Sequence, residues 1–171
     1  MVKVRRAVRA DVRAISELRV AGWRAAYPGL VPQEMLDRQD PVRETQRRGA
    51  AWESRTCDAE LVAVDATGAV IGWAVAGPAR DDEFAGAGEL YALYAHPDHW
   101  STGVGHVLMT AAEEVLRGAG YRRAYLLVLA GNTRAAGFYE RHGWIEDGTE
   151  VHDERPHGVL VERRRVRDLS A

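Results

Sequence analysis

The sequence has one cysteine and one lysine among its 171 residues, and these shortages exclude several classes of protein. Cys57 alone cannot form an internal disulfide, which is typical of proteins that fold in a reducing compartment. The N-terminal segment lacks the apolar stretch of a signal peptide, and no later apolar run reaches the ~20 residues that span a bilayer. We therefore expect a cytoplasmic protein that does not bind membranes.

A strong net charge is also missing. The net charge of −2 argues against a protein that binds nucleic acid through its overall charge. His96 and His99 are separated by Pro97-Asp98, but no His-Glu-x-x-His pattern or cysteine cluster supports a metal site, and we expect none. Neither repeats nor low-complexity tracts interrupt the chain, and we predict a single domain over residues 1–171.

The segment Leu90–Gly105 is the most informative part of the sequence. It begins as an apolar and aromatic run typical of a strand, and Pro97 then favours a turn. From Val104 onward the apolar residues recur at helical spacing, at Leu108, Ala111, Ala112 and Val115, and Gly118 and Gly120 mark the end of the helix. Backbone N–H groups at the start of a helix are unpaired and lie at the positive end of its dipole. The segment therefore predicts an anion-binding site.

Two common phosphate-binding loops are excluded by residues that this segment lacks. A P-loop ends in Gly-Lys-Ser or Gly-Lys-Thr, but the chain's only lysine is Lys3. The dinucleotide-binding fingerprint requires a third glycine at the position of Leu108. Gly103 and Gly105 could admit a phosphate because neither has a Cβ, or they could serve only to form the turn.

Two motifs, Leu93–Gly105 and Asn132–Trp144, carry a family resemblance. The first resembles the acetyl-CoA loop of the GNAT superfamily of N-acetyltransferases, which reads Gln/Arg-x-x-Gly-x-Gly/Ala after a strand. The second resembles that family's Asn-x-x-Ala-x-x-x-Tyr-x-x-x-Gly-Phe signature, and the two occur in the family's order and at its usual spacing. Trp100 stands where the family usually has glutamine or arginine. We therefore expect a phosphate loop without cationic side chains.

The resemblance implies transfer of an acetyl group from acetyl-CoA to a primary amine, by direct attack in a ternary complex. Backbone groups of Leu93 and Ala95 would hold the pantetheine arm, and one N–H group would polarise the thioester carbonyl. The loop that follows would bind the pyrophosphate through its backbone, and Asn132 would bind the pantetheine arm. The cofactor-binding residues implied are Leu93, Tyr94, Ala95, Trp100, Ser101, Thr102, Gly103, Val104, Gly105, His106, Asn132, Ala135 and Tyr139.

The resemblance also implies an acid and suggests a place for a base. Tyr139 matches the tyrosine that protonates the CoA sulfur, and Ala135, one turn earlier, leaves room for the cofactor. The alternative is a core tyrosine, which we disfavour because Phe138 is available to pack inward. Glu89, at the start of the fourth strand, is the predicted general base, acting through water. Its alternative is an ordinary carboxylate at the strand edge.

The acceptor is expected to be a small-molecule amine or a peptide N-terminus. Trp23 and Tyr27, with Glu89, are the predicted acceptor contacts, although two aromatic residues four apart are also typical of a core. The acidic segment Asp81–Glu83 either attracts a cationic amine or is only solvated. We expect no nucleic-acid partner, and a homodimer is compatible with the sequence.

The expected fold class, as the resemblance implies, is α+β: a GNAT-like three-layer α/β/α sandwich with a mixed, largely antiparallel central sheet. Periodicity predicts strands over Val2–Val8, Ala59–Val64, Ala69–Ala76, Gly88–Ala95, Tyr125–Leu129, Trp144–Val151 and Gly158–Val166. It predicts helices from Asp11, near Pro32, over Pro41–Trp52, from Val104 and over Arg134–His142. Arginines at 163–165 and 167 lie among valines, a pattern we interpret as an exposed strand edge.

Two other functions remain compatible with the same residues. A non-catalytic CoA-binding or regulatory module would keep the loop without turning over acetyl-CoA. A phosphopeptide or nucleotide binder would use the same helix N-terminus without binding CoA.

Overall fold

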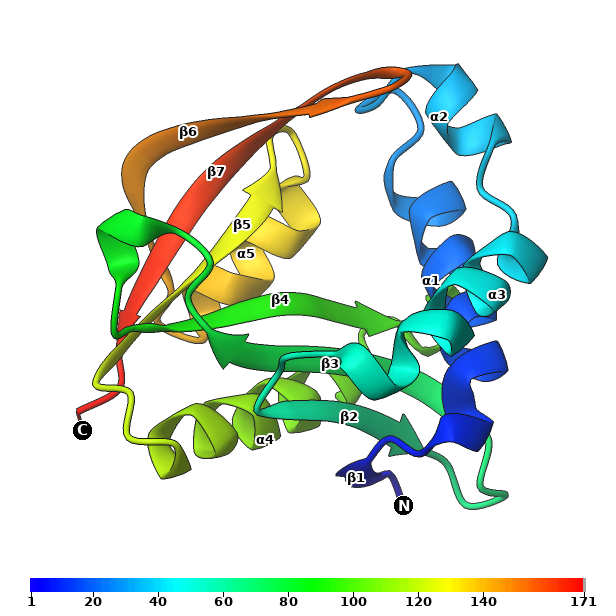
Figure 1. The fold of residues 1–171 in the computed structure, drawn as a ribbon, viewed down its shortest axis with the longest axis horizontal. Coiled ribbons are helices and arrows are strands. Elements are labelled where there is room, and N and C mark those ends of the chain that lie inside the picture. The colour runs from blue at the N-terminus through cyan, green and yellow to red at the C-terminus, as the bar shows by residue number, and fades with distance from the viewer. Residues whose placement is uncertain (171) are drawn as a thin grey trace.

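The computed structural model describes residues 1–170 and contains one seven-stranded sheet in the order β1-β2-β3-β4-β5-β7-β6 (Figure 1). Only the β4–β5 pair is parallel; every other neighbouring pair is antiparallel. The mixed, largely antiparallel sheet is therefore confirmed. The strands are β1 (Lys3–Arg6), β2 (Ala59–Val64), β3 (Val70–Pro78), β4 (Gly88–Ala95), β5 (Arg123–Leu129), β6 (Ile145–Arg155) and β7 (Gly158–Asp168).

Helices cover both faces of the sheet. They are α1 (Val12–Ala26), α2 (Gln33–Asp37), α3 (Pro41–Ala51), α4 (Val104–Gly118) and α5 (Thr133–Arg141). The largest core cluster joins α4 and α5 to one face, and a second cluster joins α1 and the segment after α3 to the other. This arrangement gives the predicted three layers. Among the described residues, no helix combines the length and the apolar character needed to cross a membrane.

The arginine-rich strand β7 is not an edge strand, and that prediction was wrong. It lies between β5 and β6, and β6 is at the edge. Arg164 and Arg165 are each only 7% exposed. Arg164 Nε donates to Asp147 Oδ2 at 2.8 Å, and Arg165 Nη1 donates to the carbonyl oxygen of Trp144 at 3.0 Å. A guanidinium can be buried when acceptors of this kind replace its water.

The feature that positions the site is the divergence of β4 from β5. The two strands pair only at Gly88–Ala124 and Glu89–Tyr125, at the start of each strand. Figure 1 shows them beginning side by side and then separating, with α1 and α2 beyond the open end. Within residues 1–170, the β5-facing edge of β4 from Leu90 to Ala95 therefore has no strand partner. A ligand that offers backbone-like donors and acceptors can occupy this edge.

Candidate active site

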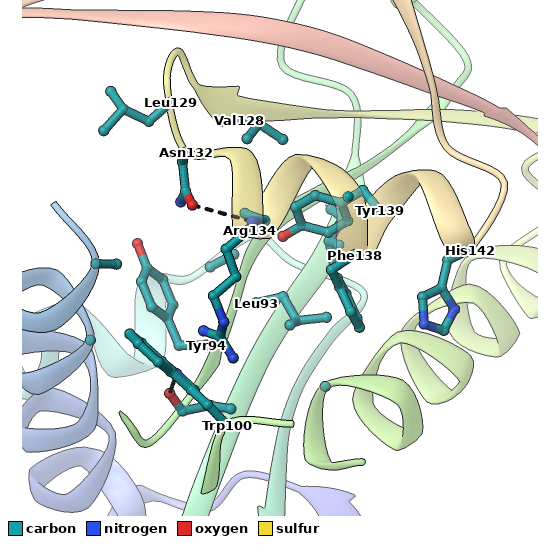
Figure 2. Close-up of a pocket in the computed structure, with 18 of the residues that line it drawn as sticks. Leu93, Tyr94, Trp100, Val128, Leu129, Asn132, Arg134, Phe138, Tyr139 and His142 are labelled. Carbon is teal, nitrogen blue, oxygen red and sulfur yellow. Dashed lines mark hydrogen bonds between the residues drawn. The ribbon is translucent and has the colours of Figure 1, made fainter. Parts of the chain in front are cut away.

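A cavity of about 730 Å³ occupies the space between the diverging strands. Its walls come from β4, β5, β7, α1, α5 and the loop that leads into α4, and Figure 2 shows most of the lining side chains. The structure brings together most of the residues that the sequence analysis selected. Those that line the cavity are Tyr27, Leu93, Tyr94, Ala95, Trp100, Ser101, Gly103, Gly105, His106, Asn132, Ala135 and Tyr139.

Four selected residues do not line this cavity: Trp23, Glu89, Thr102 and Val104. Val104 is 1% exposed and belongs to the main core, because it is the first apolar position of α4. The Thr102 hydroxyl donates to the carbonyl oxygen of His99 at 2.7 Å and so stabilises the turn before α4. The indole nitrogen of Trp23 donates to the Tyr94 hydroxyl at 3.0 Å. Trp23 therefore positions a cavity residue from the core side.

The two loop glycines are required for different physical reasons. Gly103 has φ = 93°, a left-handed conformation at the N-cap of α4 that residues with a side chain adopt only at a cost. A Cβ there would meet no atom within 4 Å, so the space above Gly103 is open. A Cβ on Gly105 would lie 3.1 Å from the ring of Phe138. Gly105 thus lets α5 pack closely against the start of α4.

Trp100 is fixed by a hydrogen bond to the end of β4 and by a cation–π contact with Arg134. Its indole nitrogen donates to the carbonyl oxygen of Ala95 at 3.0 Å, at the end of β4. The Arg134 guanidinium carbon lies 3.8 Å from the centre of the Trp100 ring, a cation–π contact visible in Figure 2. Among residues 1–170, Arg134 has no ion-pair partner, and burial lowers its pKa.

Arg134 brings a cationic side chain to the phosphate loop from another element. The phosphate loop itself carries no arginine or lysine, as expected, but α5 supplies a guanidinium above it. Sequence reasoning missed this residue because Arg134 occupies a variable position of the second motif. Only the packing of α5 on Trp100 brings it to the loop.

Tyr139 combines the two roles that the sequence analysis treated as alternatives. It belongs to the main core cluster with 9% of its surface exposed, and it also lines the cavity. In Figure 2 its hydroxyl points into the cavity above Leu93. Burial raises the pKa of Tyr139, and Tyr94 raises it further, so the phenol stays protonated at neutral pH.

Phe138 does not replace Tyr139 in the core, contrary to expectation. It is half-buried on the cavity wall, with its ring 4.6 Å from that of His142. His142 in turn lies 5.1 Å from His106. Burial, and then the neighbouring His106, lower the pKa of His142, which favours a neutral imidazole at this rim of the cavity. Asn132 Oδ1 accepts from the Ala135 N–H at 3.2 Å and caps α5.

Glu89 lies at the closed end of the β4–β5 pair, outside the cavity. Only 2% of its surface is exposed, and its carboxylate is fully engaged. It accepts from the Arg80 backbone N–H at 2.9 Å, from Arg80 Nε at 3.1 Å and from the Tyr125 hydroxyl at 2.6 Å. These bonds fix the Glu89 carboxylate outside the cavity. Its position does not support the predicted role of Glu89 as the general base.

The carboxylate that does line the cavity is Glu162 on β7, which the sequence analysis did not select. Burial is the main factor that raises its pKa. The sequence offered one signal, an acidic residue preceded by apolar ones in the last strand. The acidic segment Asp81–Glu83, by contrast, is tied to β7, since Asp81 and Glu83 lie 3.2 and 3.4 Å from Arg164. Among residues 1–170, no group of three potential metal ligands occurs.

The comparisons with known proteins agree with this geometry. The sequence profile of the acetyltransferase (GNAT) family matches residues 20–144. Over 154 residues the chain is 31% identical to the uncharacterized N-acetyltransferase YuaI of Bacillus subtilis (strain 168), covering 88% of this chain and 86% of YuaI.

Two solved structures share the fold. PaiA N-acetyltransferase from Thermoplasma acidophilum, in complex with coenzyme A, superposes with a TM-score of 0.73 at 17% identity, covering 98% of this chain and 99% of PaiA. YncA from Salmonella typhimurium, with acetyl-CoA, gives 0.72 at 20% identity, covering 100% of this chain and 95% of YncA. The family profile and the similarity to YuaI together show that the chain belongs to the GNAT family and is an N-acetyltransferase.

Proposed function

We propose that this protein transfers the acetyl group of acetyl-CoA to a primary amine by direct attack in a ternary complex. The observation that carries the proposal is the cavity between β4 and β5, with an unpaired strand edge on one side and the Tyr139 hydroxyl directed into it. Family membership supports acetyl transfer, and the structures of PaiA and YncA are complexes with coenzyme A and acetyl-CoA. The single cysteine fits the reducing cytoplasm as the compartment.

The cofactor would lie along β4 with its phosphates at the start of α4. Backbone groups of Leu93 and the N–H of Ala95 face the unpaired edge of β4 and would pair with the pantetheine arm, whereas the Ala95 carbonyl is already bonded to Trp100. The open space above Gly103 admits the pyrophosphate to the unpaired N–H groups of α4. Arg134, which has no carboxylate partner among the described residues, supplies the positive charge.

Two groups would act on the thioester. A β4 N–H donates to the carbonyl oxygen as negative charge develops, an interaction whose loss costs roughly 3 kcal/mol in other enzymes. The Tyr139 hydroxyl then donates a proton to the departing thiolate. Because burial keeps this phenol protonated, the proton is available at neutral pH.

An acceptor screen tests the function directly. Purified protein is incubated with acetyl-CoA and a panel of primary amines, and release of free CoA is followed with a thiol reagent. We expect amine-dependent release and a rise in melting temperature on adding acetyl-CoA. A thermal shift without release for any amine would identify a CoA-binding module, and the absence of a CoA-dependent shift would contradict the cofactor assignment.

A further inference from the structure

The β6–β7 hairpin reaches across to α2, beyond the end where β4 and β5 separate (Figure 1). His157 Nδ1 lies 3.2 Å from Glu34 Oε1, and a Cβ on Gly158 would meet Pro32 at 2.7 Å. Beyond these contacts, β7 runs along β5, with Glu162 opposite Leu129. The hairpin therefore places Glu162 in the cavity wall, on the side of α1 and α2.

Glu162 is the only carboxylate among the described residues that line the cavity. The residues two positions before and after Glu162, on the same face of β7, contact other parts of the protein. Leu160 is buried in the cluster that contains Trp23, and Arg164 is ion-paired with Asp147. Of these three side chains, only that of Glu162 faces the cavity.

Glu162 differs from the buried acids of this protein in having no partner. Each of the others accepts a hydrogen bond from an arginine: Asp11 from Arg5, Glu60 from Arg48, Glu89 from Arg80 and Glu113 from Arg117. Within residues 1–170, the half-buried side chain of Glu162 has neither a hydrogen bond nor an ion pair. Removing a carboxylate from water without a partner is unfavourable, so structural stability does not explain this residue.

The charged groups near Glu162 cancel one another, which leaves the charge of Glu162 itself uncompensated. They are Asp153 and Arg155 on β6, Arg80 after β3, and Glu89 on β4. Arg155 Nε donates to Asp153 Oδ2 at 2.8 Å, and Arg80 is bonded to Glu89. Each neighbouring cation thus already has its own carboxylate. The cavity wall also includes the rings of Tyr27 and Tyr94, which suit a positively charged group.

We propose that Glu162 binds the ammonium group of a cationic primary amine and is the general base that removes its proton. This proposal rests on the proposed function and adds the charge of the acceptor and the identity of the base. An acceptor whose amine is neutral, or which carries a negative charge beside its amine, is not attracted by the charge of this carboxylate. Burial raises the pKa of Glu162, which brings it closer to that of the group it must deprotonate.

The proton balance of the reaction is complete with these residues. The ammonium gives one proton to the Glu162 carboxylate and becomes a neutral amine. Its nitrogen forms a bond to the acetyl carbon, and the bond from that carbon to sulfur breaks. Tyr139 gives its proton to the departing thiolate, the second proton lost from nitrogen passes through solvent to restore the Tyr139 hydroxyl, and Glu162 releases its proton to solvent. The products are the amide, free CoA and one proton.

The test compares Glu162→Gln with Glu154→Gln, an exposed carboxylate on the same hairpin with no ion pair among the described residues. The acceptor probes are phenethylamine and putrescine, which are cationic at pH 7, and aniline, which is neutral. We expect kcat/KM for the cationic probes to fall roughly 10²-fold in Glu162→Gln, the lower end of the usual contribution of a general base. With aniline, the change should stay within a few-fold. Glu154→Gln should match the parent with every probe.

The pH profile and a binding measurement make the result specific. The parent should lose activity as pH falls through the pKa of its base, and Glu162→Gln should lack this limb, with partial recovery in Glu162→Asp. In CoA-saturated protein, phenethylamine should raise the melting temperature of the parent more than that of Glu162→Gln. Equal losses with cationic and neutral amines, or equal thermal shifts in the two proteins, would overturn the proposal. Ammonium binding through Glu162 without acetyl transfer to any probe would instead contradict the proposed function.

Discussion

The two ends of the β4–β5 pair use the same three residue types in opposite ways. At the closed end, Glu89, Tyr125 and Arg80 bond to one another, with Tyr125 Oη 2.6 Å from Glu89 Oε2. At the open end, Glu162, Tyr139 and Arg134 line the cavity, and within residues 1–170 none of them has an ion pair or a side-chain hydrogen bond. Side chains that bond to one another stabilise the sheet, whereas side chains without a protein partner can bind a ligand.

The difference follows from the register of the two strands. Where Glu89 and Tyr125 are directly paired, their side chains meet on one face and exclude water. Where the strands separate, side chains from α5 and β7 line the cavity, and within residues 1–170 those of Arg134, Tyr139 and Glu162 form no hydrogen bond or ion pair with one another. Four predictions use the closed end as the control for the open end.

The largest effect is expected for Tyr139→Phe. The change removes only the hydroxyl, and loss of a positioned acid typically lowers the rate 10²–10⁴-fold. We expect kcat to fall by about this factor, with the acetyl-CoA dissociation constant within a few-fold of the parent. Thioesters with more acidic thiols should recover part of the loss.

The matched control is Tyr125→Phe, which removes the bond to Glu89 at the closed end. It should lower the melting temperature and leave kcat within a few-fold of the parent. If thioesters with different leaving groups show equal deficits in Tyr139→Phe, then Tyr139 positions the cofactor and is not the acid.

The second prediction concerns the loop at the open end. Gly103→Val forces a β-branched residue into φ = 93° and places methyl groups where the phosphates would lie. A ligand at 100 times its dissociation constant stabilises a protein by about 2.7 kcal/mol, and this gain from acetyl-CoA should disappear. Gly86→Val imposes similar strain at φ = 79°, on an exposed loop outside the cavity, and should keep the gain. Equal CoA-dependent shifts in the two variants would exclude Gly103 from the phosphate site.

The third prediction separates the two arginines. Arg134→Leu should raise the dissociation constant of acetyl-CoA roughly tenfold, because a charge-assisted hydrogen bond contributes about 1.5–3 kcal/mol. S-acetylpantetheine, which lacks the pyrophosphate, should be used equally well by this variant and the parent. Arg80→Leu should leave the acetyl-CoA affinity unchanged while lowering stability. An affinity loss that extends to S-acetylpantetheine would show that Arg134 acts only by holding Trp100.

The sequence allowed most of the fold to be predicted, because the elements are set by local patterns. The strand Gly88–Ala95 was predicted with its observed bounds, and Gly103 was placed correctly before a helix. Glu89 was also assigned to the correct strand end. Its partner Arg80, however, lies in a loop whose direction no local pattern specifies.

Residues that reach the site by packing could not be predicted from local patterns. Arg134 reaches Trp100 because Gly105 lets α5 approach α4, a contact between segments far apart in the chain. The local pattern places Arg164 and Arg165 at an exposed edge. Both are buried, because acceptors from β6 and the loop before it bond to their guanidinium groups. The sequence marks Glu162 only as an acidic residue after apolar ones in the last strand, and the cavity is needed to give it a role.

The last prediction has the smallest effect and tests the comparison most directly, since the same chemical change is made at both ends. Glu89→Gln removes the charge that holds Arg80 and Tyr125, and it should lower stability by about 1 kcal/mol, because Arg80 is 64% exposed and regains water. That corresponds to a melting temperature lower by about 2–4 °C in a chain of this size.

Glu162→Gln should do the opposite. The pKa of Glu162 is raised in the folded state, so the ionised form destabilises the native protein wherever an unfolded glutamate is ionised. Replacing it with a neutral amide should therefore raise the melting temperature by about 1–3 °C at pH 7. The gain should disappear as pH falls toward about 4, where both states bind the proton. Melting curves of parent and variants between pH 4 and pH 8 check both signs. If both substitutions lower the melting temperature at pH 7, then Glu162 has a stabilising partner, and the contrast between the two ends does not hold.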